Sequence, residues 1–178
     1  AFSYLFYAVF PKARFTIPLH SKALIASKTT SKIPKVIWQT NYTNRVTLPV
    51  YLNYLLNRML SLDWEYRYVS TEERLEFIKS HAPDKVVNAF EQLLDGASQA
   101  DLWRLCVLNQ QGGVYMDIDA HFVWPLSKII KADDEEMFHM KKENNFTNYF
   151  MAYAPTNNHI EKDLEIVLVN KKKKKIEA

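Results

Sequence analysis

The stretch Gln111-Gly112-Gly113-Val114-Tyr115-Met116-Asp117-Ile118-Asp119 decides the fold. It contains an apolar run typical of a buried strand, and the run ends in two carboxylates spaced two residues apart. Because residues i and i+2 of an extended strand face the same side, Asp117 and Asp119 are predicted to point together from the strand's carboxyl end. Paired carboxylates at such an end suit a hard divalent cation, Mg²⁺ or Mn²⁺, that also holds a diphosphate. This pattern favours a transferase that uses a nucleotide-activated substrate.

Extended and helical patterns alternate on both sides of this stretch. Strands are expected at residues 35–39, 64–69, 114–118, 137–140 and 146–154, and helices at 50–60, 70–80, 83–94, 98–110 and 160–169. Ser70 and Glu73 form the sequence signature of a helix-capping box, and Gly112 is placed to end a helix. This alternation predicts an α/β domain with a mainly parallel sheet flanked by helices.

The 178 residues correspond to one domain by length. Residues 11–34 contain Pro11, Pro18 and Pro34 with many Ser, Thr and Lys, and residues 1–32 are expected to form an irregular lead-in. The folded domain is expected over residues 33–170, followed by a basic tail over 171–178. The alternative is a C-terminally incomplete domain, with further elements beyond this region.

The formal charge of +3 belongs to the five consecutive lysines Lys171–Lys175, and the rest of the chain is nearly neutral. No distributed basic face for nucleic acid is therefore expected. The tail is expected to be a solvated, disordered terminus, with contact to an anionic membrane surface as the alternative. The apolar residues 1–10 are too few to span a bilayer and are expected to be a core or interfacial segment, with the end of an anchor as the alternative. The single cysteine, Cys106, excludes an internal disulfide and fits a reducing compartment.

Asp101 and Arg104 lie three residues apart on the helix that precedes the acidic strand. This spacing places them on one helical face, where an ordinary surface ion pair is the simplest interpretation. Beside the strand end, however, a carboxylate is able to accept hydrogen bonds from sugar hydroxyls. A guanidinium is able to hold phosphate or sugar oxygens with a fork geometry that lysine lacks.

Taken together, these residues resemble a known family. Asp101-x-x-Arg104 followed by Gly112-Gly113-x-Tyr115-x-Asp117-x-Asp119 is similar to the signature of glycosyltransferase family 32. That family includes the fungal initiating α-1,6-mannosyltransferase and bacterial capsule and lipopolysaccharide enzymes. The segment 33–40, Ile-Pro-Lys-Val-Ile-Trp-Gln-Thr, resembles the family's first strand, although Trp38 stands where many members have His.

The resemblance implies a GT-A fold with a Rossmann-like nucleotide-sugar-binding half. It implies a metal-dependent, retaining hexosyltransferase that moves a sugar from a nucleotide-sugar donor to a glycan, lipid-linked or polysaccharide acceptor. By the same resemblance, Asp119 would bind Mn²⁺ or Mg²⁺ directly, and Asp117 would contact the donor or the metal. Asp101 and Arg104 would hold the transferred sugar and the phosphates.

Trp38 and Asn148 are further candidates for donor binding. Trp38 would lie against the nucleotide base, or else be a core aromatic at the end of a buried strand. Asn148 would reach the sugar from a later strand. Tyr115 is expected in the core rather than in catalysis. His121 is expected to be exposed or packed, with metal coordination as the alternative.

Two other functions compete with sugar transfer. A nucleotide-sugar-binding module without efficient transfer would use the same residues. An aspartate-based phosphatase also has Asp-x-Asp after an apolar strand, but that pattern normally has Thr or Val where this chain has His121. The lone cysteine favours a cytoplasmic protein peripheral to a bacterial inner membrane, with the Golgi lumen as the alternative. The sequence does not specify the sugar, the base, the acceptor or the linkage.

Overall fold

The computed structural model describes residues 2–27, 29–140 and 146–176, with the side chains of 2, 138–140, 146–148 and 170–176 outside the description. The strands are β1 (Phe15–Thr16), β2 (His20–Ser21), β3 (Val36–Thr40), β4 (Arg45–Val46), β5 (Glu65–Val69), β6 (Gly113–Met116), β7 (Glu136–Met140) and β8 (Phe146–Tyr153). The helices are α1 (Phe2–Val9), α2 (Leu48–Met59), α3 (Thr71–His81), α4 (Asp84–Glu91), α5 (Gly96–Gln111), α6 (Leu126–Ile129) and α7 (Asn158–Ile176).

The main sheet has six strands in the order β2-β5-β3-β6-β8-β7. The central strand β3 pairs in parallel with both β5 and β6, whereas the other three pairings are antiparallel. The prediction of a mainly parallel sheet is therefore wrong, and the sheet is mixed. For the β7–β8 pair the physical reason lies in the connection, because β7 ends at Met140 and β8 begins at Phe146, which leaves too few residues for a crossover helix.

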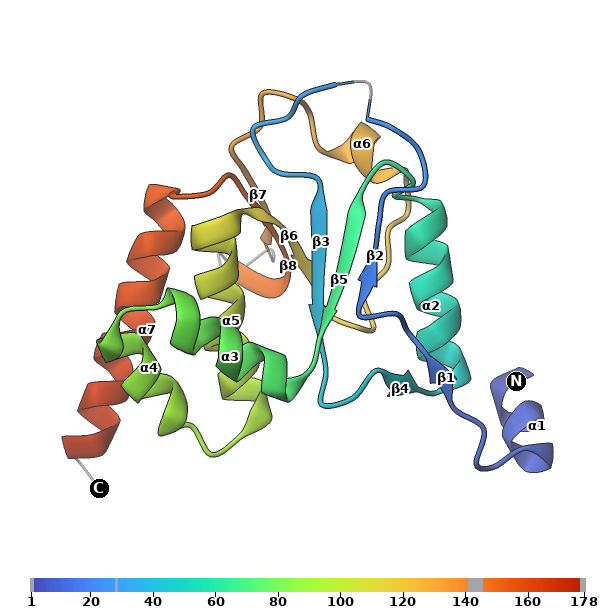
Figure 1. Cartoon of the computed structure of the whole chain (residues 1–178), viewed down its shortest axis with the longest axis horizontal. Helices are drawn as coiled ribbons and strands as arrows, with labels where there is room; N and C mark the ends of the chain where they lie inside the picture. Colours follow the sequence, from blue (N-terminus) through green and yellow to red (C-terminus); the bar gives the residue numbers. More distant parts are fainter. Residues whose placement is uncertain (1, 28, 141–145, 177–178) are drawn as a thin grey trace.

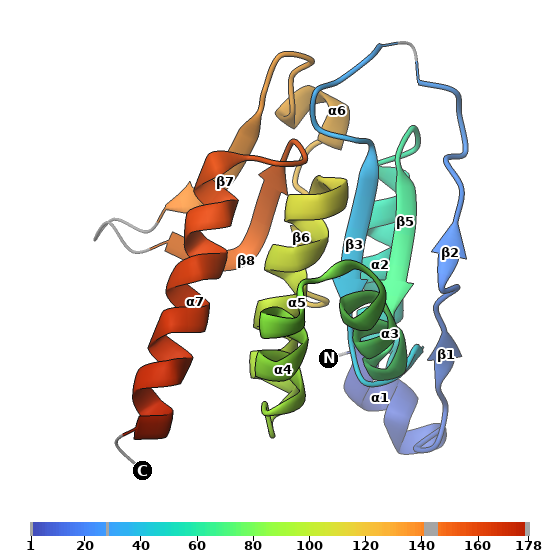
Figure 2. The same cartoon turned by 60° about the vertical axis from the view of Figure 1, so that its left-hand side comes forward.

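Helices cover both faces of the sheet, α2 on one side and α3, α4, α5 and α7 on the other (Figure 1, Figure 2). Side chains of the central strands alternate between two cores. In β6, Val114 and Met116 face the core that includes Tyr54 of α2, and Tyr115 faces the core that includes Trp103 of α5. Both faces of the central strands are thus buried from solvent, and polar groups are exposed mainly at the strand ends.

Several element boundaries follow the expected local signals. The Ser70 side chain accepts the Glu73 amide at the start of α3, and the Glu73 carboxylate accepts the Ser70 amide, so the predicted capping box is present. The helix α5 begins at Gly96 rather than at 98, because Asp95 is its N-cap and accepts the Ser98 amide. Gly112 ends α5 with a positive φ of 65°, as predicted.

The two ends of the chain are more regular than expected. The segment assigned to an irregular lead-in contains α1, β1 and β2, and β2 forms the edge of the main sheet. The run Lys171–Lys175 continues α7 as helix rather than leaving it as an irregular tail. Within the described residues, no helix combines the length and the apolar character that crossing a membrane requires.

Candidate active site

The acidic and basic residues meet because α5 runs back along β6. Gly112 is eight positions after Arg104, a helical rise of about 12 Å, and Asp117 is four positions after Gly113, a strand length of about 13 Å. The two side chains are therefore brought to the same height at the carboxyl end of β6. The turn between helix and strand needs both glycines: a Cβ on Gly113, whose φ is 104°, would come within 2.6 Å of Val36.

Arg104 is the centre of the cluster. Its Nη2 donates to Asp101 Oδ1, and its Nη1 lies 3.6 Å from Asp117 Oδ1. Its guanidinium carbon lies 5.1 Å from the centre of the Tyr115 ring. The Arg104 side chain is only 8% exposed, whereas those of Asp101 and Asp117 are 52% and 39% exposed. The buried Arg104 guanidinium thus neutralises and positions two solvent-accessible carboxylates.

Tyr115 adds a hydrogen bond to this cluster from inside the core. Its hydroxyl donates to Asp117 Oδ1 at 2.8 Å, although the residue is only 3% exposed. Burial raises the pKa of the Tyr115 phenol, and the Asp117 charge raises it further, while Arg104 opposes both effects. Tyr115 therefore stays protonated as a donor and fixes one oxygen of Asp117, Oδ1, whereas the other, Oδ2, has no hydrogen bond among the described contacts.

Asp117 and Asp119 do not lie on one extended strand. The strand β6 ends at Met116, and the Ala120 amide donates to the Asp117 carbonyl at 3.0 Å, which closes a turn over residues 117–120. The same-face argument for the two acids is therefore wrong in its geometry. The pair instead presents a half-buried carboxylate followed by an exposed one at the tip of a turn.

Three amide side chains hold this turn in place, those of buried Gln39 and Asn57 and of half-buried Asn53. Gln39 Nε2 donates to the Asp117 carbonyl at 3.0 Å. Asn53 Nδ2 donates to the carbonyls of Ile118 and Ala120 at 3.0 and 2.8 Å, and Asn57 contributes the remaining contacts at Ala120 and Phe122. Sequence reasoning missed these positioning residues. The one signal for them is polar residues on otherwise apolar positions of β3 and α2, with the two asparagines four apart.

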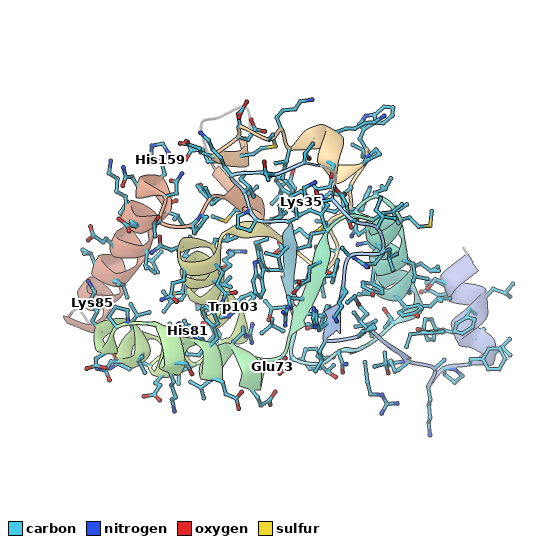
Figure 3. All side chains as sticks on the ribbon, turned by 45° about the horizontal axis from the view of Figure 1, so that its top comes forward. Lys35, Glu73, His81, Lys85, Trp103 and His159 are labelled. Atoms are coloured by element: carbon cyan, nitrogen blue, oxygen red, sulfur yellow. The ribbon has the colours of Figure 1, made fainter. Side chains whose placement is uncertain are left out.

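Trp38 occupies the core beneath the site. It is 7% exposed, and its indole N–H donates to the Gly112 carbonyl at 3.0 Å. Its ring packs edge-on against Trp103, which lies between the helices and the sheet (Figure 3). This is the placement that the core-aromatic alternative predicts, and its role is to support the turn between α5 and β6.

The two remaining candidates are Asn148 and His121. Asn148 lies on β8, the neighbour of β6, but its side chain is outside the described residues. His121 is exposed just after the turn. Neither residue is brought into the cluster of Asp101, Arg104 and Asp117 by any described contact.

The carboxylates suit a cation that is held jointly with a ligand. Within the described part of the chain, no three His, Cys, Asp or Glu side chains are grouped to hold a metal ion. Two carboxylates are nevertheless the usual protein contribution to a Mg²⁺ whose other ligands are substrate phosphates and water. Asp117 Oδ2 and the exposed Asp119 fit that description, and Arg104 reduces the repulsion between the neighbouring acids.

The position of the site in the sheet also favours ligand binding. The strand β3 has β5 on one side and β6 on the other, and the helices that follow β3 and β5 cover opposite faces. Such a change of direction opens a crevice at the carboxyl ends of parallel strands. Asn41 and Tyr42 follow β3 at this edge, and Asp117 follows β6.

Comparison with known proteins agrees with this geometry. A family model described as "Glycosyltransferase sugar-binding region containing DXD motif" matches residues 49–136. The matched family is one of glycosyltransferases. The matched region covers just under half of the chain and contains the Asp101, Arg104, Asp117 and Asp119 positions. No curated protein sequence matches the chain.

The fold is similar to that of a solved structure, "PaToxG Glycosyltransferase", with a TM-score of 0.66 at 19% identity. The match covers 79% of this chain and 62% of that one, so the chain spans less than two thirds of its neighbour's length. At this identity the likeness establishes the fold, a mixed α/β architecture consistent with a GT-A-like fold. The family model and the fold together support a glycosyltransferase in general terms.

Proposed function

We propose that the chain is a metal-dependent glycosyltransferase that takes its sugar from a nucleotide-sugar donor. The observation that carries the proposal is the cluster at the carboxyl end of β6, where buried Arg104 bridges Asp101 and Asp117 next to exposed Asp119. The matched family model for a DXD sugar-binding region supports it independently. Assignment to family 32, retention of anomeric configuration and a hexose as the transferred sugar rest on the resemblance of the motifs.

In this proposal the donor diphosphate lies over the turn at 117–120. A bound Mn²⁺ or Mg²⁺ would supply positive charge to the leaving phosphate oxygens. Asp119 and the free oxygen of Asp117 would hold that cation, while Tyr115 and Arg104 keep Asp117 in one orientation. The exposed edge of Asp101 would accept hydrogen bonds from sugar hydroxyls.

During transfer, the bond between the anomeric carbon and the diphosphate oxygen breaks, and its electron pair leaves with the diphosphate. A new bond forms to the acceptor oxygen, whose proton passes to the departing diphosphate. The positive charge that develops on the sugar is stabilised by Asp101 and Asp117, and prearranged charges of this kind are effective because they need no reorganisation. Arg104 acts through these two carboxylates rather than on the phosphates, since its side chain is nearly covered.

The base of the nucleotide is assigned to Tyr42 in preference to Trp38. Tyr42 is 77% exposed just beyond β3, whereas Trp38 is 7% exposed, and stacking on a base requires an open ring face. Tyr42→Ala is expected to weaken donor binding about tenfold, while Tyr42→Phe keeps the wild-type affinity. Calorimetric titration with the preferred nucleotide sugar measures both. Equal affinities for Tyr42→Ala and the wild type would remove Tyr42 from the site.

The direct test of function is release of nucleoside diphosphate from a panel of nucleotide sugars, with and without a glycan acceptor. The wild type with Mn²⁺ is expected to release it, and Asp117→Asn/Asp119→Asn is expected to lose that activity. Glu76→Gln/Glu91→Gln, which changes two acids on α3 and α4, is the matched control. Full activity of the Asp117/Asp119 variant in the presence of a chelator would refute the proposal.

The same panel separates the alternatives. Donor binding without product, with any acceptor, would identify a nucleotide-sugar-binding module. Phosphate release from a simple phosphoester would identify a phosphatase. The acceptor is proposed to be a glycan, a lipid-linked sugar or a polysaccharide, and the cytoplasmic face of a membrane is the proposed location, since the lone Cys106 fits a reducing compartment.

A further inference from the structure

Charge is separated along the chain in a way that the net value hides. Residues 1–62 contain eight Lys and Arg residues and no Asp or Glu, so that all 20 acidic residues lie from Asp63 onward. The nearly neutral charge of the chain without Lys171–Lys175 is thus the sum of a basic N-terminal third and an acidic remainder. A charge asymmetry of this kind is typical of proteins that meet an anionic surface.

The same N-terminal third exposes an unusual amount of apolar surface. We name it the apolar strip, and it consists of Tyr4, Leu5, Val9 and Phe10 around α1, Leu52, Leu55, Leu56 and Met59 on α2, and Leu24, Ile25 and Leu62 beside the end of α2. The four α2 residues have the i, i+3, i+4, i+7 spacing of one helical face. A soluble face of α2 would carry polar residues at these positions, so the strip needs another explanation.

The elements that carry the strip are connected by specific contacts. The Tyr7 hydroxyl of α1 accepts the Leu48 amide at the start of α2, at 2.6 Å, and Phe15 stacks on Tyr51. At the other end of α2, the Leu24 amide donates to the Leu62 carbonyl at 2.8 Å. The helices α1 and α2 lie together at one end of the molecule, far from α4 and α7 (Figure 1).

Basic side chains without acidic partners border the strip. Lys12 and Arg14 directly follow α1, Lys22 precedes Leu24, and all three are exposed. Among the described residues none of the three is in an ion pair, in contrast to Lys35, which is paired with Asp63. Arg14 does contact the Tyr7 ring and a backbone carbonyl, which keeps its charge at the edge of the strip.

We propose that the apolar strip and its basic border bind the surface of an anionic lipid bilayer. Apolar side chains enter the boundary between headgroups and acyl chains, and Lys and Arg contact the anionic headgroups. The chemistry favours this occupant over a second copy of the chain. A symmetric dimer through the strip would bring Lys12, Arg14 and Lys22 of two copies together without any acid from this region to pair with them.

The surface adjoins the candidate active site. Asn53, next to Leu52 on α2, holds the turn that carries Asp117 and Asp119. A bilayer bound to the strip would therefore contact the same helix that holds this turn. This placement rests on the proposed function, whereas binding to lipid does not and is tested without donor or metal.

The test is flotation of the full chain with vesicles of phosphatidylcholine alone and of phosphatidylcholine mixed with phosphatidylserine. Binding is expected to the mixed vesicles and to weaken in high salt. Leu52→Gln/Met59→Gln and Lys12→Glu/Arg14→Glu are each expected to lower it at least about tenfold. The matched control, Leu94→Gln/Ile166→Gln, removes two exposed apolar residues elsewhere and is expected to bind like the wild type. Melting temperatures confirm that every variant is folded.

Three results would overturn the proposal. Absence of binding to the mixed vesicles by the wild type is the first. The second is a pair of results: Leu52→Gln/Met59→Gln and Lys12→Glu/Arg14→Glu both bind as well as the wild type, and replacing Lys171–Lys175 by Gln abolishes binding. That pair would assign the contact to the end of α7. The third is concentration-dependent self-association that Leu52→Gln/Met59→Gln abolishes, without any lipid binding, which would identify a dimer face.

Discussion

Arg104 shows how one buried cation organises the candidate site. It contacts Asp101 and Asp117 with separate guanidinium nitrogens and covers the Tyr115 ring. A buried charge of this kind is stable only when its partners are all present, because an unpaired charge in the interior is costly. The two carboxylates, the Tyr115 ring and the guanidinium therefore act as one unit rather than as independent surface pairs.

Arg104→Lys is expected to lower donor hydrolysis about a hundredfold, because an ammonium cannot reach both carboxylates and a shift of about 1 Å at such a site costs that much. The measurement is kcat and KM with the preferred donor. Arg45→Lys, at an exposed position, is the matched control and is expected to retain full activity. Wild-type turnover of Arg104→Lys with an unchanged melting temperature would contradict the bridging role.

Sequence reasoning found the charged residues of the site but not the neutral ones. Asp101, Arg104 and Asp117 were predictable because the spacing of residues along the helix and the strand places all three near the carboxyl end of β6. Gln39, Asn53 and Asn57 were not, since their partners are backbone carbonyls of a turn that is more than sixty residues away in the chain. Trp38 was ambiguous because burial of an aromatic depends on what packs over it, in this case Trp103.

At the scale of elements, the junction between α5 and β6 fixes the site. Gly112 and Gly113 both have positive φ, and a Cβ on Gly113 would lie 2.6 Å from Val36 Cγ1 and from the Val36 carbonyl oxygen. The backbone of β6 at Gly113 thus approaches β3 more closely than a residue with a Cβ atom would allow. The register that places Asp117 beside Arg104 depends on this contact.

Gly113→Ala is expected to lower the free energy of unfolding by about 3 kcal/mol or more, through backbone strain and the clash with Val36. Gly96→Ala is the matched control: no atom lies within 4 Å of its Cβ position, and alanine at the start of α5 is neutral or slightly stabilising. Urea unfolding measures both variants. Equal stabilities of the two would show that the close approach of β6 to β3 is not a constraint.

The elements themselves were largely predictable, because most begin or end on local signals such as the capping box at Ser70 or the glycine after α5. The exact start of α5 was missed, since Asp95 competes with Ser98 as the N-cap. The end of β6 was also missed. Alternation favoured continuing it to Ile118, but the hydrogen bonds of Asn53 to the Ile118 and Ala120 carbonyls stabilise a turn instead.

At the scale of the whole molecule, burial of ionisable side chains sets a limit on alkaline stability. Burial raises the pKa of the Cys106 thiol from 9.0 to about 12, and it raises the pKa of Tyr66, Tyr115 and Tyr153 above 10. These groups keep their protons in the folded state after the unfolded chain has lost them. Their contribution to stability is complete below pH 9 and is lost as pH rises through the folded values.

The free energy of unfolding is therefore expected to fall between pH 9 and about pH 12. Urea unfolding at a series of pH values measures this fall, and Cys106→Ala is expected to make it shallower while leaving the tyrosine part. A stability that stays constant over this range would mean that these groups are solvated in the folded protein.

The sheet topology was the part of the fold that sequence could not supply. The alternation of strands and helices predicted parallel pairing, and β3, β5 and β6 do pair in parallel. The antiparallel addition of β2 and of the β7–β8 pair depends on long-range pairing, which has no periodic signature. The exposed strip on α1 and α2 was missed for a related reason: helical spacing predicts a face but not whether that face is covered.

The most direct test of the central claim is calorimetric titration of nucleotide sugars with and without Mn²⁺. The account predicts that one donor binds in the presence of Mn²⁺ and loses most of its affinity when the metal is chelated or when Asp119 is replaced by Asn. A donor that binds equally well without metal, or equally well to Asp117→Asn/Asp119→Asn, would contradict the assignment of the turn after β6 as the diphosphate site.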